Sequence, residues 1–117
     1  MPQVCLEYSK EISCSKKQVA DLFEFVAKKM IDVLQVAADG IKFRAHKLED
    51  SRVGYGDNYQ GFIHLSIAVL KKSERTQDMF DNLGKTYLAY LEENFAIDKK
   101  CISVEFREMD ASKYYKY

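Results

Sequence analysis

Apolar and polar residues alternate along four separate stretches of the chain. These stretches cover residues 2–9, 41–48, 61–70 and 101–109. Each has a period of two, which places its apolar side chains on one face and predicts a strand. The segment 51–60, SRVGYGDNYQ, contains two glycines together with Asp and Asn. This composition predicts a turn between the second and third strands.

Between the strands of each half of the chain, apolar residues recur at the spacing of a helix. The two apolar stripes are Val19, Leu22, Phe23, Val26, Met30, Val33 and Leu34, and Met79, Phe80, Leu83, Tyr87, Leu91 and Phe95. Ser15 with Gln18 three residues later forms a capping-box pattern, which predicts the start of the first helix. Gly40 is expected to end that helix. Ser73 is expected to cap the second helix.

The order of these elements is strand–helix–strand, turn, strand–helix–strand. Parallel strands joined by a helix require a right-handed crossover, so the pattern predicts two consecutive βαβ units. We expect an α+β fold, with a four-stranded mixed sheet and both helices on one face. The chain of 117 residues has the length of one domain. Its first repeat covers about residues 2–50, its second about 60–109, and its tail 110–117.

The face of the sheet away from the helices carries many polar side chains. The residues expected there are Lys42, Arg44, His46, Phe62, His64, Ser66, Ser103, Glu105 and Arg107. One interpretation is a solvated face of paired charges. The other is a face that is half buried against further subunits, because it includes an aromatic residue and lacks a run of Lys, Glu and Thr. The pattern alone favours neither.

Composition narrows the classes of partner. Apolar residues make up 47% of the chain and charged residues 31%, and 18 basic side chains balance 18 acidic ones. This balance argues against a nucleic-acid partner, which requires a net basic face. The apolar stretches are far shorter than the roughly 20 residues of a membrane span. No basic and then apolar leader precedes the first strand, so we expect a cytoplasmic protein.

The cysteines and histidines do not form a metal-binding pattern. Cys5, Cys14 and Cys101 are odd in number and have no paired spacing. They are therefore expected to be reduced thiols. The two histidines are 18 positions apart and add no metal-ligand spacing. We expect no metal.

Pro2 is the only proline of the chain and directly follows the initiator methionine. If Met1 is removed, the proline nitrogen becomes a secondary amine that can accept a proton. An ordinary α-amino group has a pKa of about 7.7–8.0, and an apolar or cationic environment lowers that pKa. Such an amine would suit general base catalysis near neutral pH. Alternatively, Pro2 lies at a strand edge, where its missing N–H has no cost.

Several segments together resemble one family of enzymes. MPQVCLEY begins a strand, GIKFRAHKLED and GFIHLSI follow at corresponding places, and ISVEFREMD forms the last strand. Over essentially its full length, the chain resembles 5-carboxymethyl-2-hydroxymuconate isomerase of the tautomerase superfamily. The resemblance implies a tautomerase-like homotrimer in which the polar sheet faces line a central barrel. It also implies a cofactor-free isomerase of aromatic compound catabolism, with active sites at the subunit contacts.

The resemblance assigns roles to individual residues. Pro2 corresponds to the general base that converts a small anionic 2-hydroxy-dienoate to its 2-oxo isomer. Arginines of the family hold carboxylates and stabilise the developing dienolate. Their counterparts are Lys42 and Arg44 in the GIKFRAH segment, and Lys71 or Lys72 before the second helix. His46 and His64 are expected to be hydrogen-bonded residues that support an interface or the site.

The lysines are departures from the family pattern. Lysine keeps the positive charge but lacks the bidentate fork that matches a carboxylate. The substrate is therefore expected to be anionic, but these lysines do not predict the particular diacid of the family. Lys42 could equally be a surface residue whose stem covers apolar neighbours. For Lys71 and Lys72, the sequence favours a solvated loop over a role in substrate binding.

The sequence is also compatible with two other functions. A catalytically silent trimer of the same fold would follow if Met1 were retained, because the proline nitrogen would then be an amide. The order of elements also belongs to ferredoxin-like binding modules.

Overall fold

The computed structural model describes residues 1–55 and 61–117 and contains one four-stranded sheet. The strands are β1 (Gln3–Ser9), β2 (Lys42–Leu48), β3 (Ile63–Leu70) and β4 (Ile102–Met109). Their order across the sheet is β2-β1-β3-β4. β1 pairs with β2, and β3 with β4, in parallel, whereas β1 and β3 are antiparallel. The prediction of two βαβ units in a mixed sheet is confirmed.

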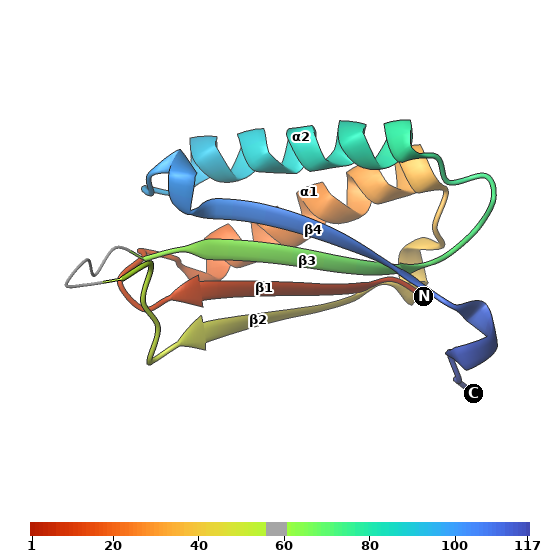
Figure 1. Cartoon of the computed structure of the whole chain (residues 1–117), viewed down its shortest axis with the longest axis horizontal. Helices are drawn as coiled ribbons and strands as arrows, with labels where there is room; N and C mark the ends of the chain where they lie inside the picture. Colours follow the sequence, from red (N-terminus) through yellow and green to blue (C-terminus); the bar gives the residue numbers. More distant parts are fainter. Residues whose placement is uncertain (56–60) are drawn as a thin grey trace.

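The two long helices, α1 (Lys16–Leu34) and α2 (Gln77–Asn94), cover one face of this sheet (Figure 1). Leu22 and Val26 of α1 and Leu83 and Leu91 of α2 are completely or almost completely buried. They pack against the inward side chains of β1 and β3, among which Leu65 is fully buried. The apolar stripes predicted from the sequence therefore form the core between helices and sheet. In the described residues, neither helix is long and apolar enough to cross a membrane.

One of the three predicted helix ends is confirmed by the structure, and the other two lie at different residues. The capping box is present: the Gln18 amide N–H donates to Ser15 Oγ at 3.1 Å, and the Ser15 amide N–H donates to Gln18 Oε1 at 2.8 Å. Gly40, however, does not end α1. The helix stops at Leu34, because Gln35 adopts the left-handed conformation, with φ 55°.

The start of α2 was also predicted at the wrong residue. Thr76, not Ser73, is the N-cap, and its Oγ1 accepts from the Met79 amide N–H at 3.3 Å. The hydroxyl of Ser73 donates instead to the Glu74 carboxylate. Residues 72–75 form a turn that is closed by the bond from the Arg75 amide N–H to the Lys72 carbonyl. The predicted turn 51–60 lies partly outside the described residues.

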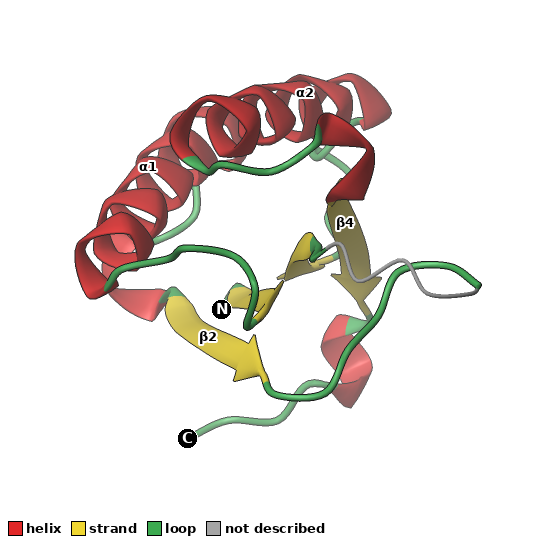
Figure 2. Ribbon diagram, turned by 90° about the vertical axis from the view of Figure 1, so that its left-hand side faces the viewer, coloured by secondary structure: helices red, strands yellow, loops and turns green. Residues whose placement is uncertain are grey.

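The opposite face of the sheet carries the predicted polar side chains in register. One row across β2, β1, β3 and β4 is His46, Glu7, His64 and Ser103; the next is Arg44, Cys5, Ser66 and Glu105. Figure 2 shows that the tail after β4 runs on this side, away from the helices. Its short helix η3 (Ala111–Lys113) turns the chain back, and Tyr114 accepts a hydrogen bond from Gln3 Nε2 at 3.1 Å.

Candidate active site

Pro2 is buried at the beginning of β1, beside the beginning of β2. Its carbonyl oxygen accepts a hydrogen bond from the amide N–H of Lys42 at 3.0 Å. This bond continues the parallel ladder that begins with Gln3 opposite Lys42. The ring of proline restricts φ as well. Pro2 is therefore held in place by the sheet, although it is next to the chain terminus.

A cavity of about 260 Å³ adjoins Pro2 at this end of the sheet. It is formed by the N-terminus, the segment after α1, the end of β3 and the turn before α2. The lining residues are Met1, Pro2, Gln35, Val36, Ala37, Leu70, Lys72 and Arg75. The left-handed turn at Gln35 directs the chain after α1 back towards Pro2. Of the two lysines expected before the second helix, Lys72 lines this cavity.

Arg75 is a residue of the cavity that the sequence analysis missed. Its Nη1 donates to the Leu70 carbonyl oxygen, and its buried Nε has no hydrogen-bond partner within the described residues. The guanidinium of a residue that lines a cavity is suited to binding an anionic group there. The sequence did contain a signal. Arg75 directly precedes the N-cap Thr76, whereas the resemblance put the corresponding arginine of the family at Lys71 or Lys72, before a helix expected to begin at Ser73.

Positive charges surround the chain terminus. The pKa of the Met1 amine is lowered, first by partial burial and then by the charges of Lys116, Arg75, Lys42 and Lys72. These cations come from the tail, from the turn before α2 and from β2. Together they favour an unprotonated amine and attract an anion to this end of the sheet.

Lys42, Arg44 and Lys71 do not line the cavity. Lys42 and Arg44 lie exposed on the open face of β2, and the guanidinium of Arg44 donates to Gln3 Oε1. Because Gln3 also bonds to Tyr114, the tail and β2 are connected through one amide side chain. Lys71 is exposed, and its amide N–H extends the pairing of β3 with β4 by donating to the Met109 carbonyl at 2.9 Å.

His64 belongs to a polar network on the open face, away from the cavity. Its Nδ1 lies 2.6 Å from Ser103 Oγ, and its Nε2 lies 3.2 Å from Glu105 Oε1. Arg107 Nε donates to the second carboxylate oxygen of Glu105 at 3.1 Å. The hydrogen bonds from Arg107 and then His64 lower the pKa of Glu105. His46 lies exposed in the same row as His64.

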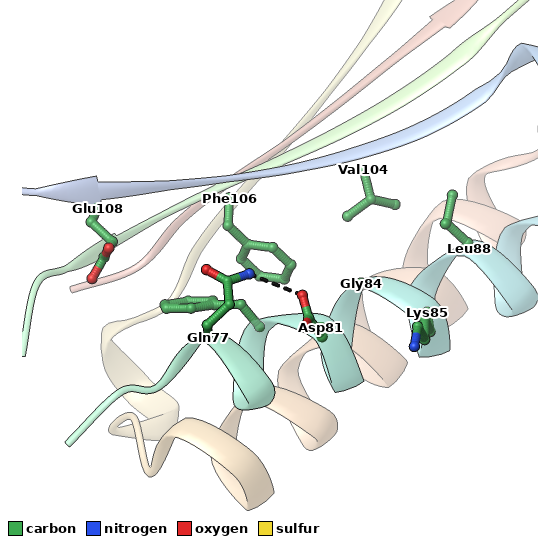
Figure 3. A pocket seen from close by; sticks show the side chains of 9 residues that line it. Gln77, Asp81, Gly84, Lys85, Leu88, Val104, Phe106 and Glu108 are labelled. Carbon is green, nitrogen blue, oxygen red and sulfur yellow. Dashed lines mark hydrogen bonds between the residues drawn. The ribbon is translucent and has the colours of Figure 1, made fainter.

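A larger groove of about 400 Å³ lies between α2 and the edge strand β4 (Figure 3). Phe106 of β4 packs beside Phe80 of α2, with 5.2 Å between the ring centroids. On the helix side, Gln77 Nε2 donates to Asp81 Oδ1 at 2.9 Å, and Lys85 supplies a single cation. The cavity at Pro2 is smaller, but it combines a terminal amine with two cations. It is therefore the better candidate for catalysis.

Several solved structures have a fold similar to that of this chain. The chain superposes on the macrophage migration inhibitory factor-like protein of Entamoeba histolytica with a TM-score of 0.75 and 15% identity, over 99% of this chain and 95% of that one. The chain superposes on the fused 4-OT symmetric trimer W0 with a TM-score of 0.81 and 14% identity, over 98% of this chain and 93% of that one. It superposes on Pt0534 inactivated by 2-oxo-3-pentynoate with a TM-score of 0.81 and 11% identity, over 97% of this chain and 90% of that one. These similarities establish a tautomerase-type fold.

The family model described as 5-carboxymethyl-2-hydroxymuconate isomerase matches residues 2–117. The chain belongs to this family and is an isomerase, as the resemblance of its segments indicated. No curated protein matched the sequence.

Proposed function

We propose that the protein is a cofactor-free tautomerase that converts a small anionic 2-hydroxy-dienoate to its 2-oxo isomer, with Pro2 as the general base. The observation that carries the proposal is the position of Pro2, which is buried beside a cavity lined by Lys72 and Arg75. Family membership supports the type of reaction. Removal of Met1 would expose the proline nitrogen as a secondary amine in this environment.

The reaction moves one proton and rearranges double bonds. The amine of Pro2 takes the proton from the 2-hydroxyl group. The enol is thereby converted to a dienolate anion. As the 2-oxo group forms, the protonated amine returns a proton to a carbon of the former diene. Atoms and electrons balance without a cofactor, because substrate and product are isomers. The charges that lower the pKa of the Met1 amine would also act on a Pro2 amine, and a lower pKa increases the unprotonated fraction that can begin this cycle.

The cations near Pro2 would bind the substrate carboxylate and stabilise the dienolate. Arg75 and Lys72, which both line the cavity, would bind the substrate carboxylate through their positive charges. Positive charge next to the developing dienolate would stabilise the transition state more than the neutral enol. Lys42 contributes charge from β2, since it lies among the groups that lower the pKa of the terminal amine.

The proposal includes a homotrimer in the cytoplasm. The open face of the sheet carries Arg44, His64 and Arg107, and a partly exposed network of this kind fits contact with further copies of the chain. In such a trimer, Arg44 and the histidines would support subunit contacts and sites between subunits. Degradation of an aromatic compound is the proposed pathway class, because it produces unsaturated hydroxy acids.

Two measurements on one sample test the proposed base and reaction. Intact mass of protein isolated from its native cell should show a chain that begins at Pro2. The ultraviolet absorbance of 2-hydroxymuconate should then change as the 2-oxo isomer forms, and Pro2→Ala should remove most of the acceleration. Full activity of Pro2→Ala would overturn the role of Pro2. A chemical check is 2-oxo-3-pentynoate, whose activated alkyne should add to the free amine of Pro2.

A silent trimer is the second candidate. The observation in its favour is that the side chain of Met1 packs against the Cα atom of Gly40. If native protein retained Met1 and showed no isomerase activity, this function would replace the first. Membership of an isomerase family argues against a ferredoxin-like binding module.

A further inference from the structure

Gly40 is a buried glycine whose backbone does not require glycine. It is the last residue of the short helix η1 (Ala38–Gly40), and its amide N–H donates to the Ala37 carbonyl at 3.1 Å. Its φ is not in the left-handed region, and α1 ends earlier, at Gln35. Any L-residue can adopt this conformation. The space above the Cα atom, and not the backbone conformation, therefore accounts for glycine at position 40.

The side chain of Met1 occupies that space. A methyl group on the Cα atom of Gly40 would overlap Met1 Sδ and lie 2.9 Å from Met1 Cε. The three heavy atoms nearest to such a methyl group all belong to Met1. The bond from the Lys42 amide to the Pro2 carbonyl keeps this part of the chain beside the terminus. Removal of Met1 would thus open a space over Gly40, next to the freed amine of Pro2.

We propose that the space over Gly40 is a subsite for the unbranched carbon chain of the substrate, and that Gly40 determines the chain length accepted. This inference rests on the proposed function. The thioether side chain that fills the space is apolar and unbranched and has four heavy atoms from Cβ to Cε. An acid whose carboxylate lies near Arg75 and Lys72 can extend a chain of similar size over Gly40.

Binding of saturated 2-oxo acids to the mature protein tests the subsite without catalysis. The series is pyruvate, 2-oxobutanoate, 2-oxopentanoate and 2-oxohexanoate, with affinities measured by NMR titration. Burial of each methylene should strengthen binding about fourfold. Gly40→Ala should weaken this dependence, and Gly40→Leu should abolish it by filling the space. A dissociation constant that does not fall with chain length in the unmodified mature protein would overturn the proposal.

Two controls separate the subsite from general effects. Gly84→Ala changes a glycine on α2, where the added methyl group meets only Phe106 Cε2 at 4.0 Å, and it should leave the series unchanged. Gly40→Ala in the mature protein should unfold at the same or a higher temperature, because its backbone is compatible and the methyl group has room. Protein that retains Met1 should show no dependence on chain length. A dependence as steep as that of mature protein would contradict the inference.

The outcomes distinguish this inference from the proposed function. If affinity rises with chain length but 2-hydroxymuconate is not isomerised, the subsite stands and the proposed reaction fails. If isomerase activity is present but Gly40→Leu binds all four acids as the unmodified protein does, the reaction stands and the subsite fails.

Discussion

The amide N–H of Lys42 donates to the carbonyl oxygen of Pro2 at 3.0 Å, so the first residue of β2 fixes the candidate base at the start of β1. The same residue contributes one of the charges that lower the pKa of the terminal amine. The pairing of two parallel strands therefore fixes the position of Pro2 and brings one of these charges to the terminus.

Arg75→Ala should lower kcat/KM roughly 10–100-fold, the effect of losing a charge-assisted hydrogen bond of about 1.5–3 kcal/mol. Steady-state kinetics with 2-hydroxymuconate measures it. Arg75→Lys should recover only part, because lysine keeps the charge without the fork. Lys85→Ala, which removes an exposed cation of α2, is the control. Unchanged kinetics for Arg75→Ala in a normally folded protein would contradict this role.

Lys116→Ala should shift the rise of kcat/KM with pH towards higher pH. Activity requires the unprotonated amine, so it increases as pH rises through the pKa of the amine. Lys116 is the first of the charges that lower the pKa of the Met1 amine. We expect it to act in the same direction on the amine of Pro2, the next residue, so its removal should raise that pKa. Lys113→Ala changes the same tail at a residue that is not among those charges. Equal pH profiles for Lys116→Ala and the unmodified protein would exclude the effect.

Lys42 does not line the cavity within one chain, but in the proposed trimer the open face of β2 would meet a site between subunits. There, Lys42→Arg should strengthen binding of a dicarboxylate relative to a monocarboxylate. Arginine adds a bidentate donor at a position where lysine supplies only a point charge. KM for 2-hydroxymuconate, compared with that for a 2-hydroxy-dienoate bearing one carboxylate, should fall several-fold in the variant. An equal change for both substrates would show that Lys42 acts through charge alone.

The fold could be predicted from the sequence because periodicity and caps agree along most of the chain. Alternation gave the four strands, and Ser15 with Gln18 gave the start of α1. The second cap could not be chosen reliably, because Ser73 and Thr76 both have hydroxyl groups that can cap a helix. Only the turn closed by Arg75 and Lys72 decides between them.

The candidate site was less accessible to sequence reasoning. Pro2 was found from its position and from the family resemblance, whereas Arg75 was missed with the wrong cap. The contribution of Lys116 depends on the fold of the tail, in which Tyr114 bonds to Gln3 across more than a hundred residues. The reason for Gly40 was also hidden, because a glycine after a helical stripe resembles a helix stop. Its contact with Met1 is a tertiary feature.

Tyr87→Phe should destabilise the protein by about 1 kcal/mol. The hydroxyl of the fully buried Tyr87 donates to the Val26 carbonyl oxygen at 2.8 Å and links α2 to α1. The variant keeps the ring contacts and removes only this bond. Urea unfolding measures the difference, with the exposed Tyr115→Phe as control. Equal loss of stability in both variants would show that the bond between the helices has no specific contribution.

Glu105→Gln should reduce the dependence of stability on acid pH. The hydrogen bonds from Arg107 and His64 lower the pKa of Glu105 in the folded protein below its ordinary value of 4.5. The ionised carboxylate therefore favours the folded state at pH values above the unfolded pKa, and this contribution disappears as pH falls through the folded pKa. Glutamine cannot titrate, so the unfolding temperatures of the variant and of the unmodified protein should converge between about pH 5 and pH 3. Glu108→Gln removes a carboxylate of the same strand outside the network. A constant difference in unfolding temperature across this range would mean that Glu105 stabilises the sheet face without a contribution from its charge.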